Sequence, residues 1–150
     1  MSEQGQTRQI AARCICGAVA FTASTTAQSL HACHCSTCRR WSGGVYMGIE
    51  VSDIRFEPQG NEKLGVFRSS EWAERLFCRE CGACLIWRMS DGSYQVVSIA
   101  ALDPQEDLPL GSELFVDERP SGYAFAGNVQ QLTGAQILAL MSGENTEAGQ

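Results

Sequence analysis

Near its middle the chain reads Cys78-Arg79-Glu80-Cys81-Gly82-Ala83-Cys84. Two residues separate Cys78 from Cys81, and this spacing lets a tight turn point both sulfurs at one metal ion. The glycine directly after Cys81 favours such a turn, because the backbone there needs a residue that tolerates a positive φ. A similar turn, Cys14-Ile15-Cys16-Gly17, stands far earlier in the chain. The two turns together predict one closed zinc site with a structural role, made by Cys14, Cys16, Cys78 and Cys81.

The remaining cysteine cluster reads Cys33-His34-Cys35-Ser36-Thr37-Cys38 and has no glycine at its turn. Three protein ligands plus one open position is the arrangement of catalytic zinc, where substrate or water takes the fourth place. Cys33, Cys35 and Cys38 therefore predict a second, open zinc site. The same cysteines also fit a second structural site closed by Cys84, His34 or His31, and the spacing leaves both interpretations open. Cys84 also fits a buried apolar thiol at the start of a strand.

The chain holds 8 cysteines in 150 residues. Its first residues are polar and lack the basic-then-apolar layout of a signal peptide, so we expect a cytoplasmic protein. Paired cysteines in a reducing compartment are more often metal ligands or catalytic thiols than disulfides. An iron–sulfur cluster is a further alternative, although this spacing does not match the usual runs.

Arg39, Arg40 and Trp41 directly follow the middle cluster. Two cations beside thiolates would lower the pKa of the thiols and attract an anionic substrate, and an indole ring would wall the pocket. These three residues are therefore candidates for substrate binding. Alternatively, the arginines offset the charge of three thiolates on zinc or lie in solvent, and the tryptophan belongs to the core.

Short alternating or β-branched segments of strand composition recur along the chain. They cover residues 8–14, 18–23, 45–51, 54–56, 64–68, 75–77, 85–89 and 94–99. The last two would form a hairpin through Asp91-Gly92, and Gly48 marks a bulge or a close approach of another backbone. A helix is predicted over residues 133–141, because Thr133 and Gln136 make a capping box before an apolar face of Ile137, Leu138 and Met141. Residues 102–110 should form an ordered loop or a single helical turn.

The fold class that follows is mainly β: a compact zinc-binding β-sheet fold with one short C-terminal helix. A hydrophobic share of 44% and a charged share of 19% favour a folded chain over a disordered one. The length fits one domain, which we place at residues 9–141, with a flexible N-terminus at 1–8 and a flexible tail at 142–150.

The composition also narrows the function. A net charge of -6, from 11 basic and 17 acidic residues, argues against a nucleic-acid partner. No apolar run approaches the roughly 20 residues of a membrane helix, so no membrane partner is expected. No glycine-rich phosphate loop occurs, and two histidines do not assemble a Ser-His-Asp set. The chemistry left is that of metals and thiols, and nothing in the sequence predicts the oligomeric state.

Three ordered motifs carry a resemblance to a known family. They read Cys14-Ile15-Cys16-Gly17-Ala18-Val19-Ala20-Phe21, Cys33-His34-Cys35 continuing through Cys38-Arg39-Arg40, and Phe67-Arg68-Ser69-Ser70-Glu71-Trp72 continuing to Cys78 and Cys81-Gly82. The pattern resembles the glutathione-dependent formaldehyde-activating enzyme family, which includes centromere protein V. The resemblance implies packed β-sheets similar to those of methionine sulfoxide reductase B domains. It also implies two zinc ions per chain, one on the four cysteines and one on Cys33, Cys35 and Cys38.

The resemblance further implies a carbon–sulfur lyase that joins glutathione and formaldehyde, as S-(hydroxymethyl)glutathione synthase does. Glutathione and a small aldehyde would then be the substrates. The alternative is a non-catalytic, zinc-stabilised module that binds a protein or a small thiol ligand, as the centromere branch of the family suggests. That branch carries a basic segment, whereas this chain is acidic, which favours the enzyme.

Overall fold

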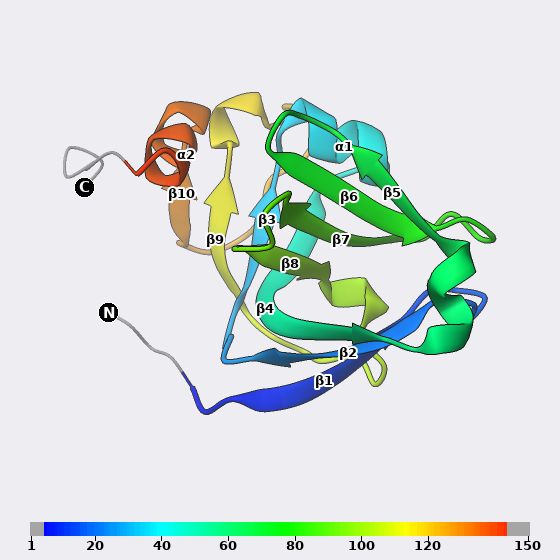
Figure 1. Ribbon diagram of the computed structural model, residues 1–150. Coiled ribbons are helices and arrows are strands. Elements are labelled where there is room, and N and C mark those ends of the chain that lie inside the picture. Colours follow the sequence, from blue (N-terminus) through cyan, green and yellow to red (C-terminus); the bar gives the residue numbers. More distant parts are fainter. Residues whose placement is uncertain (1–4, 144–150) are drawn as a thin grey trace. The chain divides into compact units, whose positions relative to one another are not determined.

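The computed structural model describes residues 5–143. Strands dominate it (Figure 1), which confirms the mainly β prediction, and its two α-helices are α1 (Ser36–Ser42) and α2 (Gly134–Met141). The chain forms two units, one from residues 5–29 and 48–108 and the other from residues 30–47 and 109–143. No helix among the described residues is long and apolar enough to cross a membrane.

The first unit is an antiparallel sheet. Its strands in spatial order are β1 (Arg8–Arg13), β2 (Ala20–Thr25), β4 (Tyr46–Phe56), β8 (Gln95–Ser98), β7 (Cys84–Met89), β6 (Ala73–Cys78) and β5 (Leu64–Arg68). The first two residues of β4 belong to the second unit. Two 3₁₀ turns, η1 (Pro58–Lys63) and η2 (Ile99–Ala101), complete this unit.

A row of apolar side chains runs across this sheet in register. Leu76, Ile86, Val97 and Ile49 are cross-strand partners on β6, β7, β8 and β4, and each is 0% exposed. Because side chains alternate between the two faces of a strand, such a register buries one face of each of these strands. The row ends at Val66 on the outermost strand β5, where the exposed fraction rises to 48%.

Gly48 marks a close approach of two strands, as its sequence context predicted. A Cβ atom at this position would lie 2.5 Å from Val96 Cγ1 and 2.7 Å from the Val97 carbonyl oxygen. Replacing Gly48 with alanine should therefore lower the free energy of unfolding by about 2 kcal/mol, because overpacking forces a backbone shift. Denaturant unfolding measures this loss. Gly44→Ala is the control, since a Cβ there meets nothing within 4 Å, and equal losses in the two variants would contradict the packing argument.

The second unit carries β3 (Leu30–Cys33), β9 (Leu110–Leu114) and β10 (Gln130–Leu132), with β9 parallel to both of the others. The 3₁₀ turn η3 (Val116–Glu118) follows β9. The predicted capping box of α2 is present, because Thr133 Oγ1 accepts from the Gln136 amide and the Gln136 side chain accepts from the Thr133 amide. Only Ile137 of the predicted apolar face is buried, whereas Leu138 and Met141 are exposed.

Several elements differ from the sequence prediction. The strands β3, β9 and β10 and the helix α1 were not predicted, because each is short and lacks a repeating apolar pattern. Residues 46–51 and 54–56 of two predicted strands lie in one continuous strand, β4, and Val45 lies just before it. Residues 102–110 were predicted as an ordered loop or a single helical turn. Residues 103–109 form an ordered loop that is joined to β1 by the ion pairs Arg13–Asp103 and Arg8–Glu106, whereas Leu102 pairs with Ala12 and Leu110 begins β9.

The single domain at residues 9–141 stays a prediction. So do the flexible ends predicted at residues 1–8 and 142–150, of which residues 1–4 and 144–150 lie outside the described part of the chain.

Candidate metal centres

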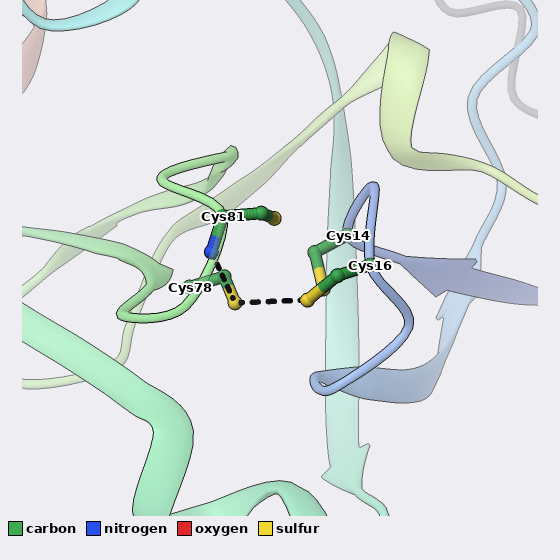
Figure 2. A group of neighbouring side chains, drawn as sticks. All are labelled: Cys14, Cys16, Cys78 and Cys81. Atoms are coloured by element: carbon green, nitrogen blue, oxygen red, sulfur yellow. Dashed lines mark hydrogen bonds between the residues drawn. The ribbon is translucent and has the colours of Figure 1, made fainter.

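The first cysteine group joins two turns of the first unit. The sulfur atoms of Cys14, Cys16, Cys78 and Cys81 all lie within 4.8 Å of one another. Cys14 directly follows β1, and Cys78 is the last residue of β6. In Figure 2 the turns face each other, with the sulfurs of Cys16 and Cys78 3.8 Å apart. The structure thus brings together the four residues that the spacing grouped.

Each turn is closed by backbone hydrogen bonds and a glycine. The Gly17 amide donates to the Cys14 carbonyl oxygen over 3.3 Å, and the Gly82 amide donates to the Cys78 carbonyl oxygen over 2.9 Å. The φ angles of Gly17 and Gly82 are +81° and +80°. This left-handed conformation strains a residue with a Cβ, so the glycines have the role that the sequence predicted.

Backbone amides also point at the sulfurs. The Val19 amide donates to Cys14 Sγ over 3.3 Å, and the amides of Glu80 and Cys81 donate to Cys78 Sγ over 3.3 and 3.4 Å. Hydrogen bonds to the charged form of a sulfur favour the thiolate, which is the form that binds metal. The backbone of both turns is therefore arranged for thiolates.

Two of the sulfur–sulfur separations match those expected around one tetrahedral metal ion. With metal–sulfur bonds of about 2.3 Å, two thiolates on one zinc lie about 3.8 Å apart. The Cys14–Cys16 and Cys16–Cys78 sulfur distances are 3.7 and 3.8 Å. The four-cysteine group can therefore hold one metal ion with little rearrangement.

Two thiols of this group, Cys81 and Cys16, differ in acidity. Burial raises the pKa of Cys81, but hydrogen bonds from the backbone and from the neighbouring thiols outweigh it and bring this pKa to about 6. A backbone hydrogen bond lowers the pKa of Cys16, yet burial and the neighbouring sulfurs raise it to about 11. A divalent cation among these sulfurs would offset the negative charge of neighbouring thiolates.

The second cysteine group lies where β3 leads into α1. The sulfurs of Cys33, Cys35 and Cys38 lie within 4.8 Å of one another. Cys35 is the N-cap of α1, and its Sγ accepts a hydrogen bond from the Cys38 amide over 3.3 Å. Because a helix start makes the turn, no glycine is needed between these cysteines.

The three thiols of this second group also crowd one another. Hydrogen bonding with the Cys35 and Cys38 sulfurs, together with burial, raises the pKa of Cys33 far above its ordinary range. The group can therefore hold a divalent metal ion, whose positive charge would offset the negative charges of the three thiolates.

His34 lies between two of these cysteines, but its ring forms hydrogen bonds with other residues. Its Nε2 is 2.7 Å from Glu113 Oε1, and its Nδ1 is 2.7 Å from the Tyr123 hydroxyl. Both ring nitrogens are thus used in hydrogen bonds, which leaves neither as a metal ligand in this arrangement. His31 lies in neither cysteine group, and burial lowers its pKa to about 4.

Glu113 is a buried carboxylate with several donors. Gln131 Nε2 donates to Oε2 over 3.2 Å, and an Arg119 guanidinium nitrogen lies 3.2 Å from Oε1. Burial raises the pKa of Glu113, but the hydrogen bonds from Gln131, His34 and Arg119 outweigh it, so the net pKa lies below its ordinary value. Glu113 is therefore ionised at neutral pH.

The predicted substrate residues have different surroundings. Arg39 donates from Nε to the His34 carbonyl oxygen over 2.9 Å and from a terminal nitrogen to the Glu118 carbonyl oxygen over 3.3 Å. Arg40 is exposed, and the half-buried Trp41 packs against Tyr46 with ring centroids 5.2 Å apart. These contacts give Arg39 a structural task, and substrate binding by the three residues stays a prediction.

Cys84 begins β7 and belongs to neither cysteine group. Burial raises the pKa of its thiol, while the nearby Arg75 guanidinium lowers it. All of the cysteines fall within the described residues, and no disulfide joins any of them.

Sequence reasoning missed Glu113, the carboxylate partner of His34, and the two residues that donate hydrogen bonds to it. Glu113, Arg119 and Gln131 stand far along the chain from the cysteines, in segments with no motif of their own. Glu113 lies in Leu110-Gly111-Ser112-Glu113-Leu114, which is a strand in the structure but has no apolar alternation in the sequence that would have marked it.

Comparison with known sequences decides the family. A profile described as glutathione-dependent formaldehyde-activating enzyme matches residues 9–118. The chain belongs to this family. The match spans both cysteine groups, so the cysteines that lie together in the structure all fall within the region that defines the family.

Individual relatives agree with this assignment. A Schizosaccharomyces pombe protein named as an uncharacterized lyase is 29% identical over 126 residues, which covers 83% of this chain and 91% of that protein. A crystal structure of a Rhodobacter sphaeroides protein matches with a TM-score of 0.54 and 23% identity, covering 67% of this chain and 99% of the other. At that identity the likeness concerns the fold.

Proposed function

We propose that this formaldehyde-activating enzyme family member is a zinc-dependent enzyme of the carbon–sulfur lyase type. It would act on adducts of glutathione with a small aldehyde, as S-(hydroxymethyl)glutathione synthase does. The observation that carries the proposal is the three-cysteine group, in which, among residues 5–143, no fourth Cys, His, Asp or Glu ligand atom lies within 4.8 Å of all three sulfurs. The family match and the relative named as a lyase support it.

Zinc is the metal that suits both groups, because soft thiolates select it over calcium, magnesium or manganese. Cys14, Cys16, Cys78 and Cys81 would hold one zinc in a closed, structural site. Cys33, Cys35 and Cys38 would hold the other and leave one position open. A zinc bound there would favour the thiolate form of a thiol that takes this position.

The reaction is an addition that needs no oxidant or reductant. The glutathione sulfur forms a bond to the aldehyde carbon, the π electrons of the carbonyl move to its oxygen, and the proton given up by the thiol ends on that oxygen. The protein would hold sulfur and aldehyde within reach of each other, which turns a bimolecular encounter into an effectively intramolecular step.

Other groups of the chain would stabilise the thiolates and bind the substrate. The Cys38 amide stabilises negative charge on Cys35 Sγ. Arg40 is exposed directly after the group and is a candidate to bind a glutathione carboxylate, as arginine does through paired hydrogen bonds. A cytoplasmic location, in which thiols stay reduced, is part of the proposal.

Exchange NMR tests this function directly. Glutathione and formaldehyde interconvert with their adduct without a catalyst, so the rate of exchange is the quantity to compare. We expect the zinc-loaded protein to accelerate the exchange at least about 10-fold, because holding both reactants removes part of the entropic barrier. Bovine serum albumin at the same thiol concentration is the control. Glutathione binding without acceleration would contradict the enzyme and favour a non-catalytic module for a small thiol ligand.

A further inference from the structure

The buried pair of Glu113 and His34 is not explained by the four- and three-cysteine groups themselves. His34 is 0% exposed and Glu113 is 1% exposed. A carboxylate only accepts hydrogen bonds, so the short 2.7 Å contact is a donation from His34 Nε2 to Glu113 Oε1. Burying the charge of Glu113 costs free energy, and replacing a buried charge and its partners by apolar residues is often neutral or stabilising. Fold stability alone therefore does not account for the pair.

The position of His34 suggests what the pair does. His34 directly separates Cys33 from Cys35, so its backbone sets the directions of both neighbouring side chains. That backbone is fixed at both ends, because its amide donates to the Leu114 carbonyl oxygen over 3.0 Å and its carbonyl oxygen accepts from Arg39 Nε over 2.9 Å.

The side chain of His34 is fixed equally well. Its ring is held between Glu113 and the Tyr123 hydroxyl, and it lies against the Phe125 ring with centroids 5.7 Å apart. Glu113 is itself held by Gln131 and by Arg119. Residues of β9, β10 and the segment after η3 are thus linked by hydrogen bonds to His34, the residue between Cys33 and Cys35.

We propose that Glu113 is a positioning residue for the three-cysteine group: through His34 it holds the peptide between Cys33 and Cys35 so that their sulfurs converge on one metal ion. Glu113 does not touch the metal in this arrangement. Partners of this kind outside the ligand set commonly affect metal affinity by 10- to 100-fold. The proposal rests on the proposed function only in that the three-cysteine group holds a metal.

The test measures metal affinity without glutathione. Co²⁺ is the probe, because thiolate–cobalt absorption reports each group, and competition with a chelator gives its affinity. We expect Glu113→Gln to weaken Co²⁺ binding at the three-cysteine group by about 10-fold or more and to leave the four-cysteine group unchanged. The four-cysteine group is thus a control within the same molecule. Glu106→Gln, which removes a carboxylate paired with Arg8 in the other unit, should change neither affinity.

Three results would overturn the proposal: an unchanged affinity in Glu113→Gln, an equal loss at both groups, and a wild-type protein that binds only one Co²⁺. If Glu113→Gln does not fold, Tyr123→Phe decides, because it removes only the hydroxyl on the other side of the His34 ring. A weaker three-cysteine group in that variant supports the proposal, and an unchanged one contradicts it. A wild-type protein that binds two Co²⁺ ions but no glutathione would contradict the proposed function alone.

Discussion

Replacing Cys78 with serine is expected to remove one metal ion per chain and to lower the free energy of unfolding by about 5 kcal/mol or more. A loss of this size is expected because structural zinc in small proteins contributes about 10 kcal/mol or more to the free energy of folding. Cys78 is 0% exposed and ends β6, and its sulfur accepts hydrogen bonds from two backbone amides. Its loss would break the link between the turn after β6 and the turn after β1.

Metal analysis of the purified variant, followed by denaturant unfolding, measures both effects. Cys84→Ser is the matched control, since Cys84 follows on the same hairpin but belongs to neither cysteine group. We expect it to keep both metal ions and most of the stability. A Cys78→Ser protein with the wild-type metal content would contradict the structural role of the four-cysteine group.

The second large effect is expected at Cys38. Replacing Cys38 with serine should remove the metal ion of the three-cysteine group, leave the four-cysteine group loaded, and weaken glutathione binding by about 100-fold or more. Two thiolates cannot hold zinc as three do, and the open position disappears with the metal. The fold should survive, because the four-cysteine group is in the other unit.

Native mass spectrometry counts the metal ions in this variant. Thr37→Ala is the control, since Thr37 is an exposed neighbour on the same helix α1 and is not a metal ligand. Cys38→Ser with two metal ions per chain would show that another residue completes the site, and the open-site interpretation would then be wrong.

The four-cysteine group illustrates what the sequence can predict. Metal-binding turns are local, so the Cys-Gly pairs at Cys16-Gly17 and Cys81-Gly82 report a backbone conformation that the structure shows. The capping box at Thr133 and the close approach at Gly48 are equally local and were equally predictable. Each of these features depends on a few neighbouring residues.

Features that depend on distant residues could not be predicted. The helix α1 has no apolar periodicity, and it forms where Cys35 caps it and where Glu118 accepts from the Ser36 amide. The parallel pairing of β3 with β9 joins segments that are separated by about half of the chain. For the same reason Glu113 was invisible as the partner of His34, because only this pairing brings the two together.

Calorimetric titration with glutathione and with S-methylglutathione tests the central claim, that the three-cysteine group holds a zinc with an open position for the glutathione sulfur. The two ligands share the same peptide and differ at the sulfur, which cannot become a thiolate once methylated. We expect the protein with two zinc ions to bind glutathione at least about 10-fold more tightly than S-methylglutathione, and we expect Cys38→Ser to lose this preference. Equal binding of the two ligands by the wild-type protein, or a preference that survives in Cys38→Ser, would contradict the claim.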